Sequence, residues 1–256
     1  DTLQALALQK LFKKINITTV IPVVRDDIYG REFYGLINNL SGNENFTVME
    51  PIFYDPDTDF INRTLDEVTS ATKSVDKSSD SGILIIGFNE AADILKGASE
   101  YPDLASFSWF GTDAIALSDT IPRNSDIAAF AAKTNFTATI FGELENEPSF
   151  IEFSKRIQEI TGMKTTPYAV VIHDAVHLAA MTDMMSHGIP DKRAIFVENA
   201  DHFYGVTGYT SLTDAGERKF ANIDYWRIKE DNGTYSWSKI GRFVNQMAGP
   251  IIDLKQ

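Results

Sequence analysis

Cysteine is absent from the 256 residues of this chain. Its absence excludes disulfide bonds, thiol nucleophiles and cysteine metal ligands, but it leaves the compartment open because many exported proteins lack disulfides. No apolar run reaches the roughly 18 residues that a membrane-spanning helix needs, and the first residues lack the charged and apolar leader of a signal peptide. We therefore expect the chain as given to be soluble.

Basic residues are in the minority. Lys and Arg number 23 against 36 Asp and Glu, which gives a formal net charge of −13. Such a surface repels phosphate backbones and anionic lipids, so nucleic acid is not an expected partner. The apolar fraction of 43% can still fill one large or two small hydrophobic cores. The composition predicts a globular protein.

Motifs for nucleophilic catalysis and phosphate binding are also missing. The sequence has no Gly-x-Ser-x-Gly elbow, no P-loop and no Gly-x-Gly-x-x-Gly. Carboxylate pairs suited to glycosidase chemistry remain an alternative, because some of the 36 acidic residues must be neighbours in space. We expect a protein without catalysis and without a cofactor.

Two patterns favour a metal only weakly. His173 and His177 stand four residues apart on one predicted helix, but no Glu follows His173 as a zinc-protease motif requires, so helix packing is the favoured role. Asp26 and Asp27 resemble the acidic pair that binds magnesium in response-regulator receivers. The Asp and Lys that such a site also needs, at the ends of the third and fifth strands, are missing. We expect no metal site.

Asn-Xaa-Ser/Thr sequons are frequent and indicate an exported protein that can be glycosylated, archaeal or eukaryotic rather than bacterial. The alternative is a surface that is simply rich in Asn and Thr. The six sequons are at Asn16, Asn39, Asn45, Asn62, Asn135 and Asn232.

The first two thirds of the chain alternate short β-branched runs with helical patterns. This alternation predicts repeated βαβ units and a parallel sheet with helices on both faces. The predicted strands are residues 17–24, 47–54, 82–88, 107–111 and 136–141. The predicted helices are residues 29–40, 59–75 and 89–101, the last of them capped by Asn89.

The remainder of the chain has a different pattern. We predict helices at 148–161, 168–187 and 190–200, and strands at 205–212, 222–229 and 235–243 with a hairpin turn at Asp231-Asn232-Gly233. The helix from Tyr168 to His187 is apolar on nearly every side, so it must be covered on several sides.

Seven segments, read in order, resemble markers of the type I periplasmic binding proteins, of the branched-chain amino-acid receptor kind. They are Asp1-Thr2-Leu3-Gln4, Val23-Val24-Arg25-Asp26-Asp27-Ile28-Tyr29-Gly30, Tyr54-Asp55-Pro56-Asp57-Thr58-Asp59-Phe60, Trp109-Phe110-Gly111-Thr112-Asp113, Ile172-His173-Asp174-Ala175-Val176, Gly205-Val206-Thr207-Gly208 and Tyr225-Trp226-Arg227-Ile228.

The resemblance implies a Rossmann-like α/β fold, a three-layer parallel sheet with additional C-terminal helices and strands. In that family a segment that builds most of lobe 1 precedes the first of these markers, and we expect it to be missing here. Residues 1–145 would then form the lobe 2 core, 146–205 helices of lobe 1, 206–243 strands returning to lobe 2, and 244–256 a tail.

Ligands of open α/β sheets bind beyond the carboxyl ends of the strands, where several polar residues fall. The resemblance makes Asp113 the counter-ion of a ligand ammonium, and Asp1 a second contact. Tyr29 can cover the ligand with its ring and donate through its hydroxyl, and Phe88 and Asn89 can line the same cleft. The alternatives are a surface turn for Asp113, an ordinary helix-start aromatic for Tyr29, and core contact and N-cap for the other pair.

The sequence therefore predicts a receptor for a small polar solute, an amino acid or related amide, captured by closure of two lobes and delivered to an ABC transporter permease. The alternative is the ligand-sensing ectodomain of a signalling receptor, and an enzyme comes third. We expect an extracellular or periplasmic location with a membrane anchor in the full-length protein. A homodimer is expected to cover the Tyr168–His187 helix, unless residues Val244 to Leu254 pack on it.

Overall fold

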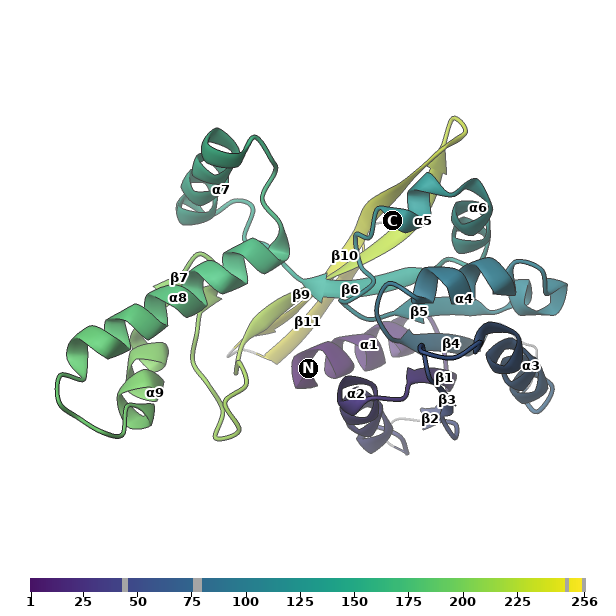
Figure 1. Ribbon diagram of the computed structural model, residues 1–256, viewed down its shortest axis with the longest axis horizontal. Helices are drawn as coiled ribbons and strands as arrows, with labels where there is room; N and C mark the ends of the chain where they lie inside the picture. The colour runs from purple at the N-terminus through teal and green to yellow at the C-terminus, as the bar shows by residue number, and fades with distance from the viewer. Residues whose placement is uncertain (43–45, 76–79, 247–248, 255–256) are drawn as a thin grey trace. The chain divides into compact units, whose positions relative to one another are not determined.

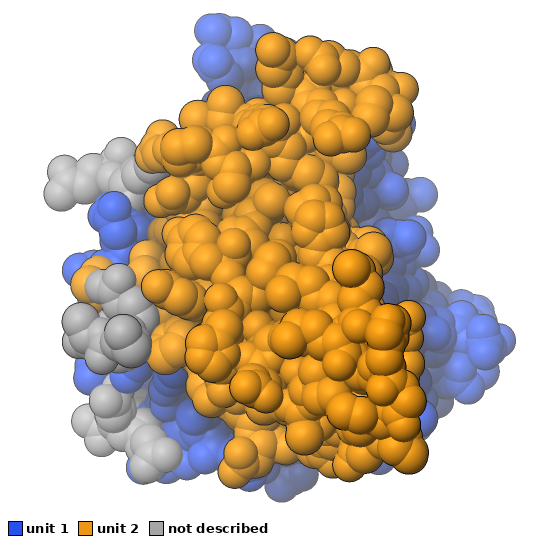
Figure 2. Space-filling view, turned by 90° about the vertical axis from the view of Figure 1, so that its left-hand side faces the viewer, with its two compact units in different colours: residues 1–140, 225–241, 252–256 blue, residues 141–224, 242–251 orange. Residues whose placement is uncertain are grey.

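The computed structural model describes residues 1–42, 46–75, 80–246 and 249–254 (Figure 1). The chain forms two compact units, which Figure 2 shows in different colours. Unit 1 comprises residues 1–140, 225–241 and 252–256, and unit 2 comprises residues 141–224 and 242–251. In the part of the chain that the structure describes, no helix is both long and apolar enough to cross a bilayer.

Unit 1 is an α/β fold around a mainly parallel sheet. Its helices are α1 (Thr2–Lys14), α2 (Ile28–Asn39), α3 (Ile61–Thr72), α4 (Ala91–Ala98), α5 (Thr120–Arg123) and α6 (Ser125–Lys133), with a 3₁₀ turn η1 (Pro102–Ser106). The first strands are β1 (Thr19–Arg25), β2 (Thr47–Val48), β3 (Ile52–Tyr54), β4 (Ser81–Ile86), β5 (Ser108–Gly111) and β6 (Thr137–Phe141). The later strands are β9 (Ala221–Asp231), β10 (Thr234–Gln246) and β11 (Gly249–Leu254), and each of these three strands has residues in both units.

The strand order in the sheet is β11-β10-β9-β6-β5-β4-β1-β2, and β3 also pairs with β1. Parallel pairing joins β1 to β2, β3 and β4, and joins β5 to β4 and β6. The five strands expected from the sequence thus share one sheet, and the predicted fold class is confirmed.

Neighbouring residues of β5 show how the sheet is covered on both faces. The Trp109 ring contacts Phe130 of α6 edge-on at 5.5 Å between centroids, whereas the Phe110 ring contacts Phe12 of α1 at 4.7 Å. Because successive strand residues point to opposite faces, α1 and α6 lie on opposite sides of the sheet (Figure 1). The fold therefore has three layers.

Helix α1 was not predicted as a helix from the sequence. Its Ala5, Leu8 and Phe12 are buried, and its Gln4 side chain donates to the carbonyl oxygen and Oγ1 of Thr139 at 3.3 and 3.0 Å. The first marker segment of the chain thus begins a helix that packs on the sheet.

Other local predictions need correction. The expected strand 47–54 is broken into β2 and β3, because residues 49–51 stand opposite only two residues of β1 and Pro51 has no N–H to donate. The N-cap of α4 is Glu90 rather than Asn89, so the helix begins one residue later than a cap at Asn89 would give. Residues 244–256, expected to be a tail, contain the end of β10 and the edge strand β11.

Unit 2 contains α7 (Pro148–Thr161), α8 (Pro167–Met185), α9 (Arg193–His202), β7 (Tyr204–Gly205) and β8 (Gly208–Tyr209). The predicted strand 205–212 is wrong, because β7 and β8 form a short antiparallel hairpin there. A small apolar cluster of Phe150, Val170 and Val206 is buried in this unit. The described residues of Val244 to Leu254 belong to β10 and β11.

The side chain of Asp174 fixes the turn between β7 and β8. Its buried carboxylate accepts hydrogen bonds from the backbone N–H of Val206 at 3.0 Å and of Thr207 at 2.8 Å, and from the Thr207 hydroxyl. A side chain at Gly205 would collide with the same carboxylate. Two of the marker segments are therefore joined by a structural contact.

Candidate ligand-binding site

Three of the residues expected to bind ligand meet at the carboxyl ends of β1, β4 and β5. Tyr29 lies in the first turn of α2, Phe88 follows β4, and Asp113 follows β5. Parallel strands end at the same edge of the sheet, so these segments lie beside each other. All three residues belong to unit 1.

Tyr29 is the centre of this group. Its hydroxyl donates to Oγ1 of the buried Thr112 at 2.8 Å and lies 3.4 Å from Oδ1 of Asp113. Its ring stacks on Phe88, with 5.0 Å between the centroids. The arrangement places an aromatic surface, a hydroxyl and a partly exposed carboxylate within one site.

Two large apolar side chains of unit 1 are exposed next to Tyr29, one beside it in sequence and one in ring contact with it. The large apolar residues that are exposed in the described part of this unit are Ile28 at 78% and Phe88 at 38%. Ile28 precedes Tyr29 in the chain, and Phe88 stacks on it. Apolar surface left in water beside a carboxylate suits a solute that carries both an apolar part and a positive charge.

Asn89 and Asp1 have less direct positions. Asn89 is exposed, and its carbonyl oxygen accepts from the N–H of Ala92 at the start of α4. Asp1 is exposed at the N-cap of α1, where its carbonyl oxygen accepts from Ala5 without a side-chain cap. For both residues a role in ligand binding stays a prediction.

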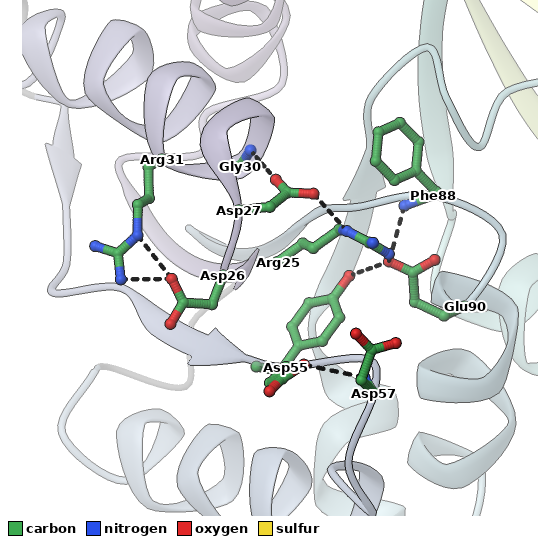
Figure 3. A network of polar contacts seen from close by, with 10 residues as sticks. Arg25, Asp26, Asp27, Gly30, Arg31, Asp55, Asp57, Phe88 and Glu90 are labelled. Carbon is green, nitrogen blue, oxygen red and sulfur yellow. Dashed lines mark hydrogen bonds and ion pairs between the residues drawn. The ribbon is translucent and has the colours of Figure 1, made fainter.

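A network of polar contacts that the sequence did not reveal lies next to Phe88 (Figure 3). Arg25, at the end of β1, donates to Asp27 at 2.6 Å and to Glu90 at 2.9 Å, and its guanidinium lies over the Phe88 ring at 5.0 Å from the centroid. The same Glu90 oxygen accepts from the Tyr54 hydroxyl at 3.0 Å and from the Phe88 N–H at 3.2 Å. Long-range pairing of this kind leaves no local sequence pattern.

Charge pairing sets the pKa values in this network. Burial alone raises the pKa of Glu90, but the hydrogen bonds from Arg25, from backbone N–H groups and from Tyr54 outweigh it and leave the pKa lowered. The hydrogen bond to Glu90 raises the pKa of Arg25. Burial, together with the Glu90 charge, raises the pKa of Tyr54. At neutral pH the pair Arg25–Glu90 is therefore ionised.

Asp26 and Asp27 are both engaged by arginines. Asp27 is the N-cap of α2 and accepts from the Gly30 N–H at 2.8 Å in addition to Arg25. Asp26 accepts from Arg31 Nε at 2.7 Å. These contacts give the acidic pair a structural role. Among the described residues, no group of three or more acidic or histidine side chains is placed to hold a metal.

An open pocket of about 750 Å³ also lies within unit 2, lined by residues that include Tyr204, Tyr209 and Phe220. The acidic residue in its lining, Asp201, lies 3.5 Å from Lys219. The pocket thus has a largely apolar wall, and its carboxylate is already paired. The site at the strand ends combines aromatic rings with a carboxylate, which suits an amphipathic solute better.

The mainly parallel sheet and its two helical layers match the fold of the type I periplasmic binding proteins. The model of the family described as receptor family ligand binding region matches residues 1–231. The chain belongs to this family.

The chain is similar to several longer proteins. An uncharacterized protein of Methanocaldococcus jannaschii is 24% identical over 94% of this chain and 59% of its own length. A leucine-binding protein of Thermotoga maritima has 14% identity and a TM-score of 0.66, covering 93% of this chain and 65% of that one. A solute-binding protein of an ABC transporter from Rhodopseudomonas palustris, in complex with 3,4-dihydroxybenzoic acid, has 14% identity and a TM-score of 0.66, covering 95% and 65%. The chain thus spans about two thirds or less of their lengths.

Proposed function

We propose that this chain is the ligand-binding part of a non-catalytic receptor for a small polar solute, an amino acid or a related amide. The observation that carries the proposal is the meeting of Tyr29, Phe88 and Asp113 at one edge of the sheet. The Asp113 carboxylate would pair with the ligand ammonium, and the stacked rings would cover its apolar part. None of these steps requires a covalent bond.

The receptor would deliver its ligand to an ABC transporter permease. The similarity to binding proteins that are named for such transporters supports this choice. The alternative is the sensory ectodomain of a signalling receptor, which the family description as a receptor region also fits. A transporter gene neighbourhood would favour the first, and a downstream membrane span with a kinase or methyl-accepting domain the second.

An extracellular or periplasmic location follows from the same role, with a membrane anchor in the full-length protein. The sequons support this location. Asn16 and Asn232 are exposed at positive φ, and Asn232 lies in the turn between β9 and β10. Mass spectrometry of the native protein would test the location, since glycan masses at these residues require export, whereas an unmodified chain would not support it.

We also propose a homodimer through α8. Its exposed face carries large apolar side chains that include Ile172 at 61%, Val176 at 59% and Met184 at 71% exposure. Apolar surface of this extent on one helix is unfavourable in water. A two-fold arrangement would cover it with an identical surface.

A thermal-shift screen tests the proposed function. Amino acids, their amides and aromatic acids without an amine are added separately to the protein, because a solute that binds only the native state raises the melting temperature. The proposal expects stabilisation by an amine-bearing solute. Stabilisation by amine-free acids alone would contradict the role of Asp113, and turnover of a stabilising solute would indicate an enzyme.

A further inference from the structure

We propose that Arg25 is a positioning residue of the ligand site. It fixes the two aromatic side chains of the site, Tyr29 and Phe88, without contacting the ligand. The inference rests on the proposed function for its binding test, but its structural part can be tested without ligand. Arg25 is connected by hydrogen bonds to two parts of the site. One connection leads to Phe88, and the other leads to the helix that carries Tyr29.

The first link runs through Glu90. Arg25 Nη1 pairs with Glu90 Oε1 at 2.9 Å, and the same oxygen accepts from the backbone N–H of Phe88 at 3.2 Å. The guanidinium also lies 5.0 Å from the centroid of the Phe88 ring, within the range of a cation–π contact. Arg25 therefore restrains the backbone of Phe88 and its ring at once.

The second link runs through Asp27. Arg25 Nε donates to Asp27 Oδ2 at 2.6 Å, while Asp27 Oδ1 accepts from the Gly30 N–H at 2.8 Å and caps α2. Tyr29 lies within this capped turn. A fixed cap therefore fixes the backbone position of Tyr29. The Tyr29 hydroxyl can then donate its hydrogen bond to Thr112.

Arg25 acts through other residues and does not supply charge to the ligand. In the described structure, the guanidinium of Arg25 donates hydrogen bonds to Asp27 and Glu90. Its positive charge is therefore already paired with carboxylates. The side chains of Arg25 and Glu90 are only 25% and 15% exposed. The planar guanidinium can bind two carboxylates in fixed directions, which the point charge of lysine does not do.

A spectroscopic experiment tests the structural part in the ligand-free protein. Tyrosines are labelled as 3-fluorotyrosine, and the Tyr29 resonance in the ¹⁹F NMR spectrum is assigned by its loss in Tyr29→Phe. We expect Arg25→Met to shift or broaden this resonance, and Arg25→Lys to do so to a smaller extent. Arg31→Met is the matched control, since Arg31 pairs with Asp26 and lies over Phe53 instead. An unchanged Tyr29 resonance in folded Arg25→Lys and Arg25→Met would overturn the inference.

A double-mutant cycle tests the effect on binding by calorimetry, with a solute identified in the thermal-shift screen. Arg25→Met should weaken binding by about tenfold when Phe88 is present, and by clearly less in a Phe88→Ala background, because coupled residues are not additive. Arg25→Lys follows the same cycle if Arg25→Met does not fold. Equal losses in both backgrounds, or no loss at all, would overturn the positioning role. If no solute binds the wild type, the proposed function fails, and the NMR result still decides whether Arg25 holds Tyr29.

Discussion

At the scale of single residues, two glycines allow the network behind the site to form. A Cβ on Gly30 would collide with the carbonyl oxygen of Arg25, and a Cβ on Gly87 would collide with the Tyr54 hydroxyl. The Tyr-Gly pair at the start of α2 is thus explained by a close backbone approach. It does not require a direct role of Gly30 in ligand binding.

Gly30→Ala should therefore destabilise the protein by about 1–3 kcal/mol, the usual cost of forcing extra volume into a packed position. Gly35→Ala, five residues later in α2, is the matched control because a Cβ there meets no atom within 4 Å. It should be stabilising by about 0.5–1 kcal/mol, since alanine favours a helix. Urea denaturation of both variants measures the difference, and equal stabilities would show that the Arg25 carbonyl moves away without cost.

Glu90 gives a pH dependence with a defined sign. Its pKa is lowered in the folded protein, so the folded state favours the ionised carboxylate. The stability that this provides is present at neutral pH and is lost as the pH falls below the ordinary value of 4.5 and through the folded pKa. The measurement is urea denaturation of wild type and Glu90→Gln between pH 7 and pH 3. The stability difference should shrink toward acid, and a constant difference would contradict the assignment.

At the scale of secondary structure, the sequence predicted the sheet because β1, β4 and β5 contain short apolar runs that are buried on both faces. Helix α1 was missed although Ala5, Leu8 and Phe12 are spaced as in an amphipathic helix, so this signal was available. The β7–β8 turn was not predictable in the same way. It depends on the Asp174 carboxylate, which is distant in sequence.

The exposed face of α8 leads to a prediction about assembly. If equivalent helices cover each other, the protein should be a dimer by size-exclusion chromatography with light scattering, and Val176→Glu should convert it to a monomer because a charge would enter the interface. Ile160→Glu on α7 is the control, since Ile160 is equally apolar and 72% exposed but lies on another helix. A monomeric wild type, or a dimer that Val176→Glu leaves intact, would refute the dimer through α8.

At the scale of the whole molecule, part of the candidate site could be inferred from the sequence. Tyr29, Phe88 and Asp113 follow strands that were predicted correctly, and the rule that parallel strands end at one edge brings them together. Arg25 and Glu90 were not found, because their contacts join the ends of β1 and β4 and depend on the strand order. The net charge of −13 favours a cationic solute over an anionic one.

The role of Asp113 is tested most directly by calorimetric titration of wild type and Asp113→Asn with the amino acid that gives the largest thermal shift. The substitution keeps the size of the side chain and removes its charge. Binding should weaken by about 1.5–3 kcal/mol, as expected for the loss of a hydrogen bond to a charged group. The desamino analogue of the same ligand should bind both proteins equally weakly. Unchanged affinity of Asp113→Asn for the amino acid would contradict the assignment of this edge of the sheet as an ammonium-binding site.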